Sequence, residues 1–276
     1  MADLTYSRLA APSRRAEAPA RRLTVPRSLL GWLVPILIAL AWESTCRAGL
    51  VRPSLLPAPS AVGATLWHLA VSGELWLHLG STCARLGLGF VLGTAFGTAL
   101  GAITGTSPLA RGLLDPMVQA LRSVPSIAWV PLFILWLGIF ESSKVALIAV
   151  GVFFPVYLNL MLGIAQVDRK LIEVGRIHRL SRMAQIRRIL LPAALPAYIT
   201  GLRSGLGLGW MFVVAAELMG ASEGIGFLLI DGQQTGRPAL VIGAILLFAV
   251  LGKLTDLVLA RAGAALLAWQ DVAEES

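Results

Sequence analysis

The segment Glu173–Pro196, EVGRIHRLSRMAQIRRILLPAALP, gathers charged side chains and a histidine in a chain that is otherwise apolar. Its leucines and isoleucines recur every three to four residues, which is typical of amphipathic helices. Ser181 has the residue type of a helix N-cap, and Pro192 and Pro196 predict that the helix ends near Leu190, because proline lacks a backbone donor. We therefore expect a helix–turn–helix that either contacts anionic lipid head groups or docks a partner protein.

Residue sets that could carry catalysis are not suggested by the sequence. The phosphate-binding pattern GxxxxGK[ST] is absent, and its nearest fragment, GKLT at residues 252–255, lacks the upstream glycine. Cys46 and Cys83 do not have metal-ligand spacing, so they are interpreted as small buried apolar side chains, with a disulfide as the alternative. We expect a protein that is not an enzyme and has no cofactor or metal of its own.

The elements that position the charged segment follow from composition. The chain has 276 residues, of which 57% are hydrophobic and 14% charged, whereas soluble domains average about 45–50% and about 25%. This predicts an all-α membrane protein. The net charge of +8 does not indicate nucleic-acid binding, because the basic residues lie in gaps between apolar runs. Residues 1–27 are predicted to be a disordered basic tail, 28–269 the membrane domain and 270–276 a second tail.

Six apolar segments approach the length of about 20 residues that a helix needs to cross a bilayer. They are Ser28–Cys46, Ala84–Thr106, Ser123–Phe140, Lys144–Val167, Arg203–Ala221 and Pro238–Ala260. Between the first two, Ser60 is expected to cap a short helix that runs to about Ala70 along the outer surface.

The positions of Lys and Arg predict the orientation of these spans. Cytoplasmic connections carry the excess of positive charge. Basic residues are concentrated in the N-terminal tail, in the connection that holds Arg111 and Arg122, and in residues 169–188. Six spans place all three on one side, so both termini are predicted to be cytoplasmic.

Glycines recur at every fourth position in the second apolar segment, on one face of the predicted helix. They are Gly89, Gly93, Gly97, Gly101 and Gly105. Small residues allow transmembrane helices to approach closely. The face is interpreted either as packing within one subunit or as a surface along which halves of the bundle slide.

Charged residues inside the apolar segments are candidate functional sites, because they are costly in a membrane. Glu217 is interpreted either as a pathway or gate residue paired with Arg203 or Arg237, or as a residue at the outer helix end. Arg85 is expected to extend toward the outer interface.

The charged segment resembles the coupling motif of permease subunits of ATP-binding-cassette importers, whose pattern is E-A-A-R-x-L-G-A-S, a short helix and L-P-x-A-x-P. The matching residues are Glu173, Gly175, Arg176, Ser181, Leu191, Pro192, Ala194 and Pro196. Other stretches, among them LDPMVQALRSVPSIAWVPLFILWLGIFESSK and AELMGASEGIGFLL, are similar to the nitrate, taurine and aliphatic-sulfonate branch.

The resemblance implies the type I importer permease fold, with six transmembrane helices and a cytoplasmic coupling loop at residues 168–200. It also implies transport of a small anionic substrate across the bacterial inner membrane by alternating access. The implied partners are an ATPase dimer that binds the ATP, a second permease copy, an extracytoplasmic substrate-binding protein and membrane lipid. The alternative is a secondary transporter or channel, which would show inverted repeats and ion-coordinating acids at midplane.

One position departs from the family pattern. The family's L-G-A turn is His178-Arg179-Leu180 in this chain. Glycine adopts left-handed backbone angles at little cost, whereas Arg179 would carry strain of about 1–2 kcal/mol. Either the turn is strained or it has another shape.

Overall fold

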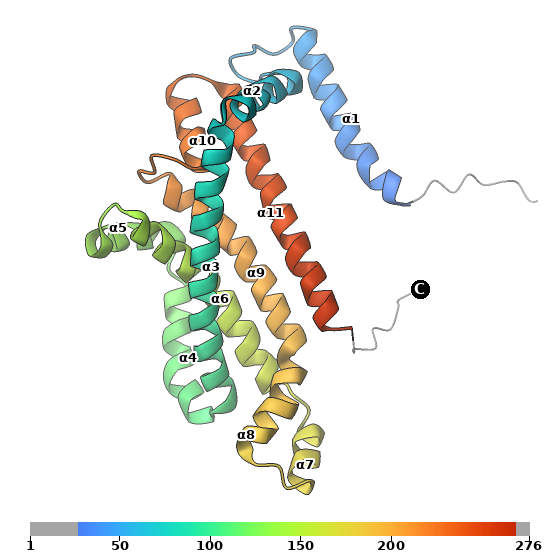
Figure 1. The fold of residues 1–276 in the computed structure, drawn as a ribbon, viewed down its shortest axis with the longest axis vertical. Coiled ribbons are helices and arrows are strands. Elements are labelled where there is room, and N and C mark those ends of the chain that lie inside the picture. The colour runs from blue at the N-terminus through green and yellow to red at the C-terminus, as the bar shows by residue number, and fades with distance from the viewer. Residues whose placement is uncertain (1–26, 269–276) are drawn as a thin grey trace, which may run out of the picture.

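A computed structural model describes residues 27–268, and all regular elements among them are helical (Figure 1). The predicted all-α class is confirmed. The elements are α1 (Arg27–Arg47), α2 (Pro59–Ser72), α3 (Glu74–Thr106), α4 (Pro108–Arg122), α5 (Ser126–Leu137), α6 (Glu141–Ala165), α7 (Arg169–Ile177), α8 (Arg182–Gln185), the π-helical turn η1 (Ile186–Leu190), α9 (Leu191–Glu217), α10 (Ile225–Gln234) and α11 (Pro238–Leu266). The predicted tails lie outside the described residues, except that Arg27 begins α1.

Helix α6 is the centre of the bundle and packs against both α3 and α9. The consecutive residues 154–157 are all buried, so this part of α6 has no free face. Val152 and Val156 of α6 belong to a core that includes Leu206 and Val213 of α9. Lipid tails are as apolar as these side chains, so the association of the helices depends on close van der Waals packing.

The glycine face of α3 lies directly against α6. A methyl group added at Gly89 would lie 2.5 Å from Ile148 Cγ2, and one added at Gly101 would lie 2.9 Å from the Tyr157 carbonyl oxygen. Gly93, Gly97 and Gly105 likewise approach α6. All five glycines therefore mediate helix packing within one subunit.

The number of spans differs from the six that the sequence predicts. In the described part of the chain, four helices are long and apolar enough to cross a membrane: α3, α6, the continuous helix Arg182–Glu217, and α11. A fifth span is counted if α4 and the following Ile127–Leu137 form one broken crossing. Helix α1 has 21 residues and is apolar but is not among these four.

The predicted span Ser123–Phe140 is not a straight helix. Helix α5 has 12 residues, about 18 Å at 1.5 Å per residue, which is too short to cross. The helices before and after the Ser123–Pro125 connection meet at 104°. Pro125 lies between them, and proline disfavours helical geometry in the residue before it.

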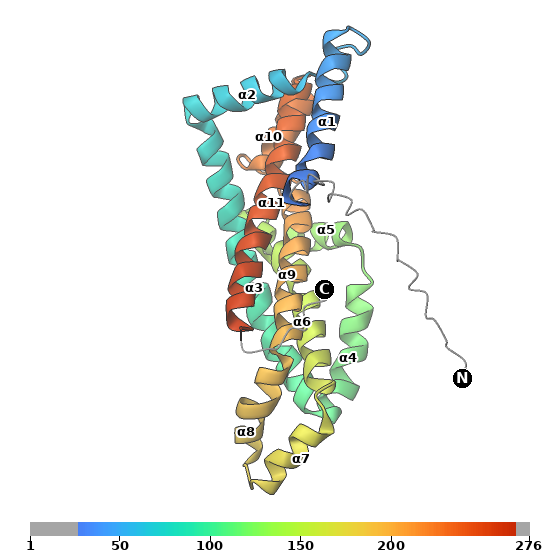
Figure 2. The same ribbon diagram turned by 90° about the vertical axis from the view of Figure 1, so that its right-hand side faces the viewer.

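The length of α4 places Arg122 away from the end of the bundle predicted for it. Arg111 contacts the end of α3, where it donates to the Thr104 carbonyl oxygen at 3.3 Å. Arg122 lies eleven residues further along α4, about 16 Å away along a helix axis. Figure 2 shows α4 running from the α7–α8 end of the bundle to α5 at mid-height. The two arginines thus do not share one end of the bundle.

Helix α2 crosses the opposite end of the bundle from α7 and α8 (Figure 2), close to the predicted surface helix. Ser60 does not cap it, because the N-cap residue is Ala58 and makes no side-chain hydrogen bond. Instead Glu43 of α1 accepts the Ser60 backbone N–H at 3.0 Å and the Ser60 hydroxyl at 2.8 Å. A carboxylate from another helix takes the capping role that the sequence assigned to Ser60.

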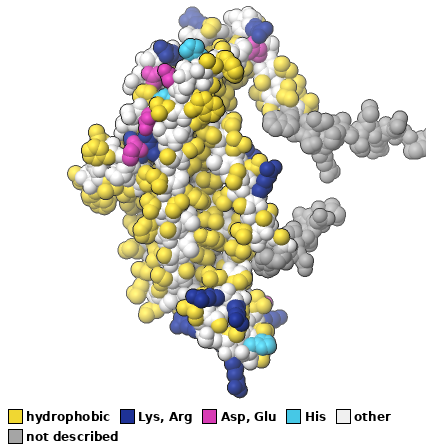
Figure 3. Space-filling model, in the orientation of Figure 1, with side chains coloured by type: hydrophobic (Ala, Val, Ile, Leu, Met, Phe, Trp, Pro, Cys, Tyr) yellow, Lys and Arg dark blue, Asp and Glu magenta, His cyan; other side chains and the backbone are white. Residues whose placement is uncertain are grey.

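The side chains sort along the long axis of the molecule. On the face seen in Figure 3, hydrophobic side chains cover the middle, and Lys and Arg lie without acidic neighbours at the end that holds α7 and α8 and beside acidic side chains toward the α2 end. Asp and Glu lie toward the α2 end. Cys46 and Cys83 are both free, and Cys83 is exposed rather than buried. This distribution fits a bundle whose two ends are exposed to water and whose middle is surrounded by lipid.

Candidate functional site: the α7–α8 elbow and a buried charge cluster

The charged segment forms a projection at one end of the bundle (Figure 1). We call residues 168–190 the elbow. Asp168 caps its first helix, because its side chain accepts the Lys170 backbone N–H at 2.9 Å. Gly175 is buried where α7 meets η1, and a methyl group added there would lie 2.6 Å from Ile189 Cδ1. Gly175 therefore permits the two arms of the elbow to pack together.

The turn between the arms keeps glycine-type geometry although it has no glycine. Arg179 has φ of 52° and is the single non-glycine residue with positive φ in the described part of the chain. The Leu180 N–H donates to the Gly175 carbonyl at 3.0 Å, and the Arg179 N–H donates to the Arg176 carbonyl at 2.9 Å. This pair of bonds is the Schellman arrangement, in which the left-handed residue is usually glycine. The turn is therefore strained rather than reshaped.

We expect Arg179→Gly to stabilise this turn by about 1 kcal/mol, because glycine adopts positive φ without strain. Amide hydrogen exchange of the purified full-length chain, followed by mass spectrometry, should slow about fivefold across residues 175–185. The matched control is Arg176→Gly, which places glycine inside helix α7 and should speed exchange there. Equal effects of the same sign would contradict the assignment of strain to Arg179.

The second arm begins as predicted but does not end as predicted. The Ser181 hydroxyl accepts the Ala184 backbone N–H at 3.3 Å, which confirms the cap. Pro192 and Pro196 do not stop the helix, because α8, η1 and α9 form one helix over Arg182–Glu217. The Leu191 N–H donates to the Ile186 carbonyl, a π-helical bond. Pro192 follows in the first turn of α9, where a missing donor is tolerated.

The residues that match the coupling motif fall into two groups. Glu173 and Arg176 are exposed on α7 and form no ion pair with any described residue. Ala194 is only 1% exposed and packs against α6 beside Leu160 and Ile164. Leu191, Pro192 and Pro196 belong to the start of α9. One group can face a partner, and the other joins the elbow to the bundle.

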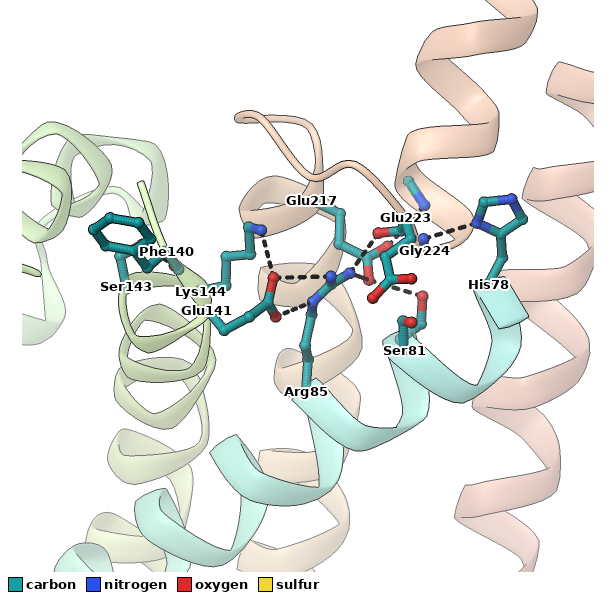
Figure 4. Close-up of polar contacts among 12 residues, drawn as sticks. His78, Ser81, Arg85, Phe140, Glu141, Ser143, Lys144, Glu217, Glu223 and Gly224 are labelled. Atoms are coloured by element: carbon teal, nitrogen blue, oxygen red, sulfur yellow. Dashed lines mark hydrogen bonds and ion pairs between the residues drawn. The ribbon is translucent and has the colours of Figure 1, made fainter. Parts of the chain in front are cut away.

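Figure 4 shows a cluster of four charged side chains, of which Arg85, Lys144 and Glu217 are buried. Arg85 of α3 contacts Glu217 of α9 at 2.7 Å, and their side chains are 4% and 0% exposed. Arg85 also contacts Glu141 of α6 at 2.5 Å and 3.0 Å, and Lys144 contacts Glu141 at 2.7 Å. The cluster joins three helices with two positive and two negative groups.

The expected partners of Glu217 were therefore wrong. Its partner is Arg85, and Arg203 instead pairs with Asp256 of α11 at 2.9 Å. Arg85 does not extend to the interface, because two carboxylates hold its guanidinium inside the protein.

The same cluster fastens the connection between α9 and α10. Glu217 also accepts the Thr82 hydroxyl and the Gly226 N–H, both at 2.8 Å. The His78 Nδ1 atom accepts the Gly224 N–H at 3.0 Å. Gly224 has φ of 122°, and a methyl group there would lie 2.5 Å from Glu217 Oε1. Both carboxylate oxygens of Glu217 therefore accept hydrogen bonds from donors of this chain.

Residues 93–265 match the family described as binding-protein-dependent transport system inner membrane component. The chain belongs to this family. It is a multi-pass membrane permease.

Among curated relatives, the permease is 41% identical over 261 residues to the putative aliphatic sulfonates transport permease protein SsuC of Bacillus subtilis. That alignment covers 93% of this chain and 95% of the relative. It is 33% identical over 243 residues to the taurine transport system permease protein TauC of Escherichia coli, with 86% of each chain covered. These likenesses confirm the branch that the sequence motifs indicate.

The fold of the permease is that of a solved importer. The MetNI methionine ABC transporter in an inward-facing conformation matches with a TM-score of 0.59 at 20% identity, over 74% of this chain and 98% of the other. The type I permease fold is confirmed, whereas the count of six spans is not.

Sequence reasoning found the elbow of the permease and two of the four charges of the cluster, Arg85 and Glu217, but not their pairing. Thr82 and Glu141 were not selected, since each is an ordinary residue type without a local pattern, and His78 was interpreted as an interfacial or loop residue. The one available signal was the glycine pair Gly224 and Gly226 close after Glu217, because such glycines mark a close backbone approach.

Proposed function

We propose that this permease is the membrane subunit of an ATP-driven importer and that its elbow docks an ATPase subunit, which binds the ATP. The observation that carries the proposal is the exposed surface of the elbow. Glu173 and Arg176 have no partner among the described residues, and Ile177 and Met183 are 78% and 58% exposed. Free charges next to exposed apolar side chains are typical of a protein interface.

The helix Arg182–Glu217 gives this docking surface a mechanical role. It continues without a break from the elbow to Glu217 in the charge cluster. Movement of a docked ATPase would therefore reach the opposite end of the bundle through one helix.

The remaining partners follow from the family. The family name requires a substrate-binding protein, which would approach the α2 end. A second copy of the permease would complete the pathway, and lipid would surround the bundle. Because ATP is cytoplasmic, the elbow and both termini would lie on the cytoplasmic side. The relatives named for aliphatic sulfonates and taurine indicate a small anionic substrate that carries a sulfonate group.

A charge reversal on the elbow tests the proposal. Glu173→Lys should abolish co-purification of the cognate ATPase and substrate uptake, because it places a repulsive charge in the interface. Membrane insertion should persist, since Glu173 is exposed and unpaired within the chain.

The matched control is Glu74→Lys, an exposed residue at the opposite end of the bundle. This variant should retain the ATPase. Normal ATPase co-purification and uptake in Glu173→Lys would refute the docking role, and uptake by the permease without any ATPase would refute the importer.

A further inference from the structure

Arg122 occupies an unusual place for a charged residue. Arg122 is the last residue of α4. It lines the same cavity as Gly151, Pro155 and Asn159, which places it beside the middle of α6. A cation at this depth is costly unless it is paired or serves a function. Arginine does not escape the cost by losing its proton.

Three other basic residues on the helices of the bundle have carboxylate partners. Arg85, Lys144 and Arg203 each lie within 2.9 Å of a carboxylate oxygen. The Arg122 guanidinium makes no hydrogen bond or ion pair with any described residue. Its charge is therefore available to an anion from outside the chain.

The cavity beside Arg122 has a volume of about 430 Å³, within the range of small-molecule sites. Its polar lining includes Arg122, Ser123 and Asn159, whereas Trp129, Phe154 and Phe212 supply aromatic walls. The Asn159 amide nitrogen donates to the Pro155 carbonyl at 2.9 Å. The guanidinium can pair with an anionic head group, and the aromatic walls can contact an apolar body.

Charge further restricts the occupant. Neither Asp nor Glu is among the described residues that line this cavity. An ammonium group would thus meet a cation and no carboxylate, which disfavours an amino sulfonate such as taurine. A bare nitrate would leave the aromatic walls without contact.

We propose that Arg122 and this cavity form a substrate site within the membrane, which holds the head group of an organic sulfonate that has an apolar tail and no amine. The inference rests on the proposed import of sulfonates and assigns a place for the substrate inside the permease.

Binding to the purified full-length permease, without the substrate-binding protein, tests this site. Equilibrium dialysis of radiolabelled sodium hexanesulfonate in a non-ionic detergent should show saturable binding. Arg122→Gln should weaken it about tenfold or more, since a charged hydrogen-bond donor is lost, and Arg122→Lys should weaken it less. The matched control, Arg111→Gln on the same helix outside the cavity, should leave binding unchanged.

Competition separates the possible occupants. Unlabelled hexanesulfonate should displace the label, whereas taurine, nitrate and phosphatidylglycerol should displace it much less. The proposal is overturned if the wild type shows no saturable binding, if Arg122→Gln binds normally, or if any of these three competes equally well.

Co-purification with the ATPase is measured in parallel for each variant. Failure of the wild-type permease to hold the ATPase would refute the proposed docking and leave the dialysis result standing. Loss of the ATPase in Arg122→Gln but not in Arg111→Gln would overturn the site, because Arg122 would then support the fold.

Discussion

Replacement of Glu217 by glutamine is expected to destabilise the permease by about 1.5–3 kcal/mol, because the buried Arg85 guanidinium loses one of its two carboxylate partners. Arg85 would keep Glu141, whose side chain is 59% exposed, and lose the carboxylate that is fully buried. Thermal unfolding of the purified full-length chain, followed by near-ultraviolet circular dichroism, measures the loss. The amide has the size of the carboxylate, so packing is conserved.

Glu223→Gln is the matched control for this prediction. It makes the same chemical change six residues away. The backbone carbonyl of Glu223 accepts from Arg85 at 2.6 Å and is kept in the variant. The Glu223 carboxylate makes no hydrogen bond to any described residue. The control should change stability by less than about 0.5 kcal/mol. The double variant Arg85→Gln with Glu217→Gln should lose less than the sum of the single variants. Equal stability of Glu217→Gln and Glu223→Gln would show that the cluster does not hold the helices together.

The second large effect is expected at the glycine face. In Gly97→Ala the added methyl group would lie 2.9 Å from the Phe153 carbonyl oxygen and 3.0 Å from Val156 Cβ. Backbone cannot move aside as a side-chain tip can, so α3 and α6 must separate, at about 1–3 kcal/mol. The same thermal unfolding measurement should show a lower midpoint.

Gly87→Ala on the same helix is the control, because nothing lies within 4 Å of a methyl group there. This variant should be neutral or stabilising, since alanine favours a helix by about 1 kcal/mol over glycine. A lower midpoint for Gly87→Ala than for Gly97→Ala would contradict the assignment of the glycine face to helix packing.

Several features of the permease could be predicted because they depend on residues close in sequence. Ser181 caps α8, as its residue type and position before the apolar periodicity indicate. The i+4 glycines share a face in any helix, so a close contact was predictable although its partner, α6, was not. Composition alone placed the chain in a membrane and in the all-α class.

Local patterns misled where a neighbouring element changes the cost of a conformation. Proline ends most helices, but here a π-helical turn precedes Pro192 and the helix continues. Ser60 has the residue type of a helix N-cap, but the carboxylate of Glu43 instead accepts hydrogen bonds from its backbone N–H and its hydroxyl. Arg179 adopts a left-handed conformation because the turn is fixed by the packing of Gly175 on Ile189.

The sequence by itself determined that this chain is a helical membrane permease with a charged elbow, because hydropathy, periodicity and a contiguous motif are properties of neighbouring residues. Only the tertiary structure decided which charges meet. Glu217 pairs with Arg85, 132 positions away, and Arg122 is left unpaired beside a cavity at the α4–α5 bend. Whether a charge in a membrane finds a partner depends on which helices lie side by side, and no local spacing records this.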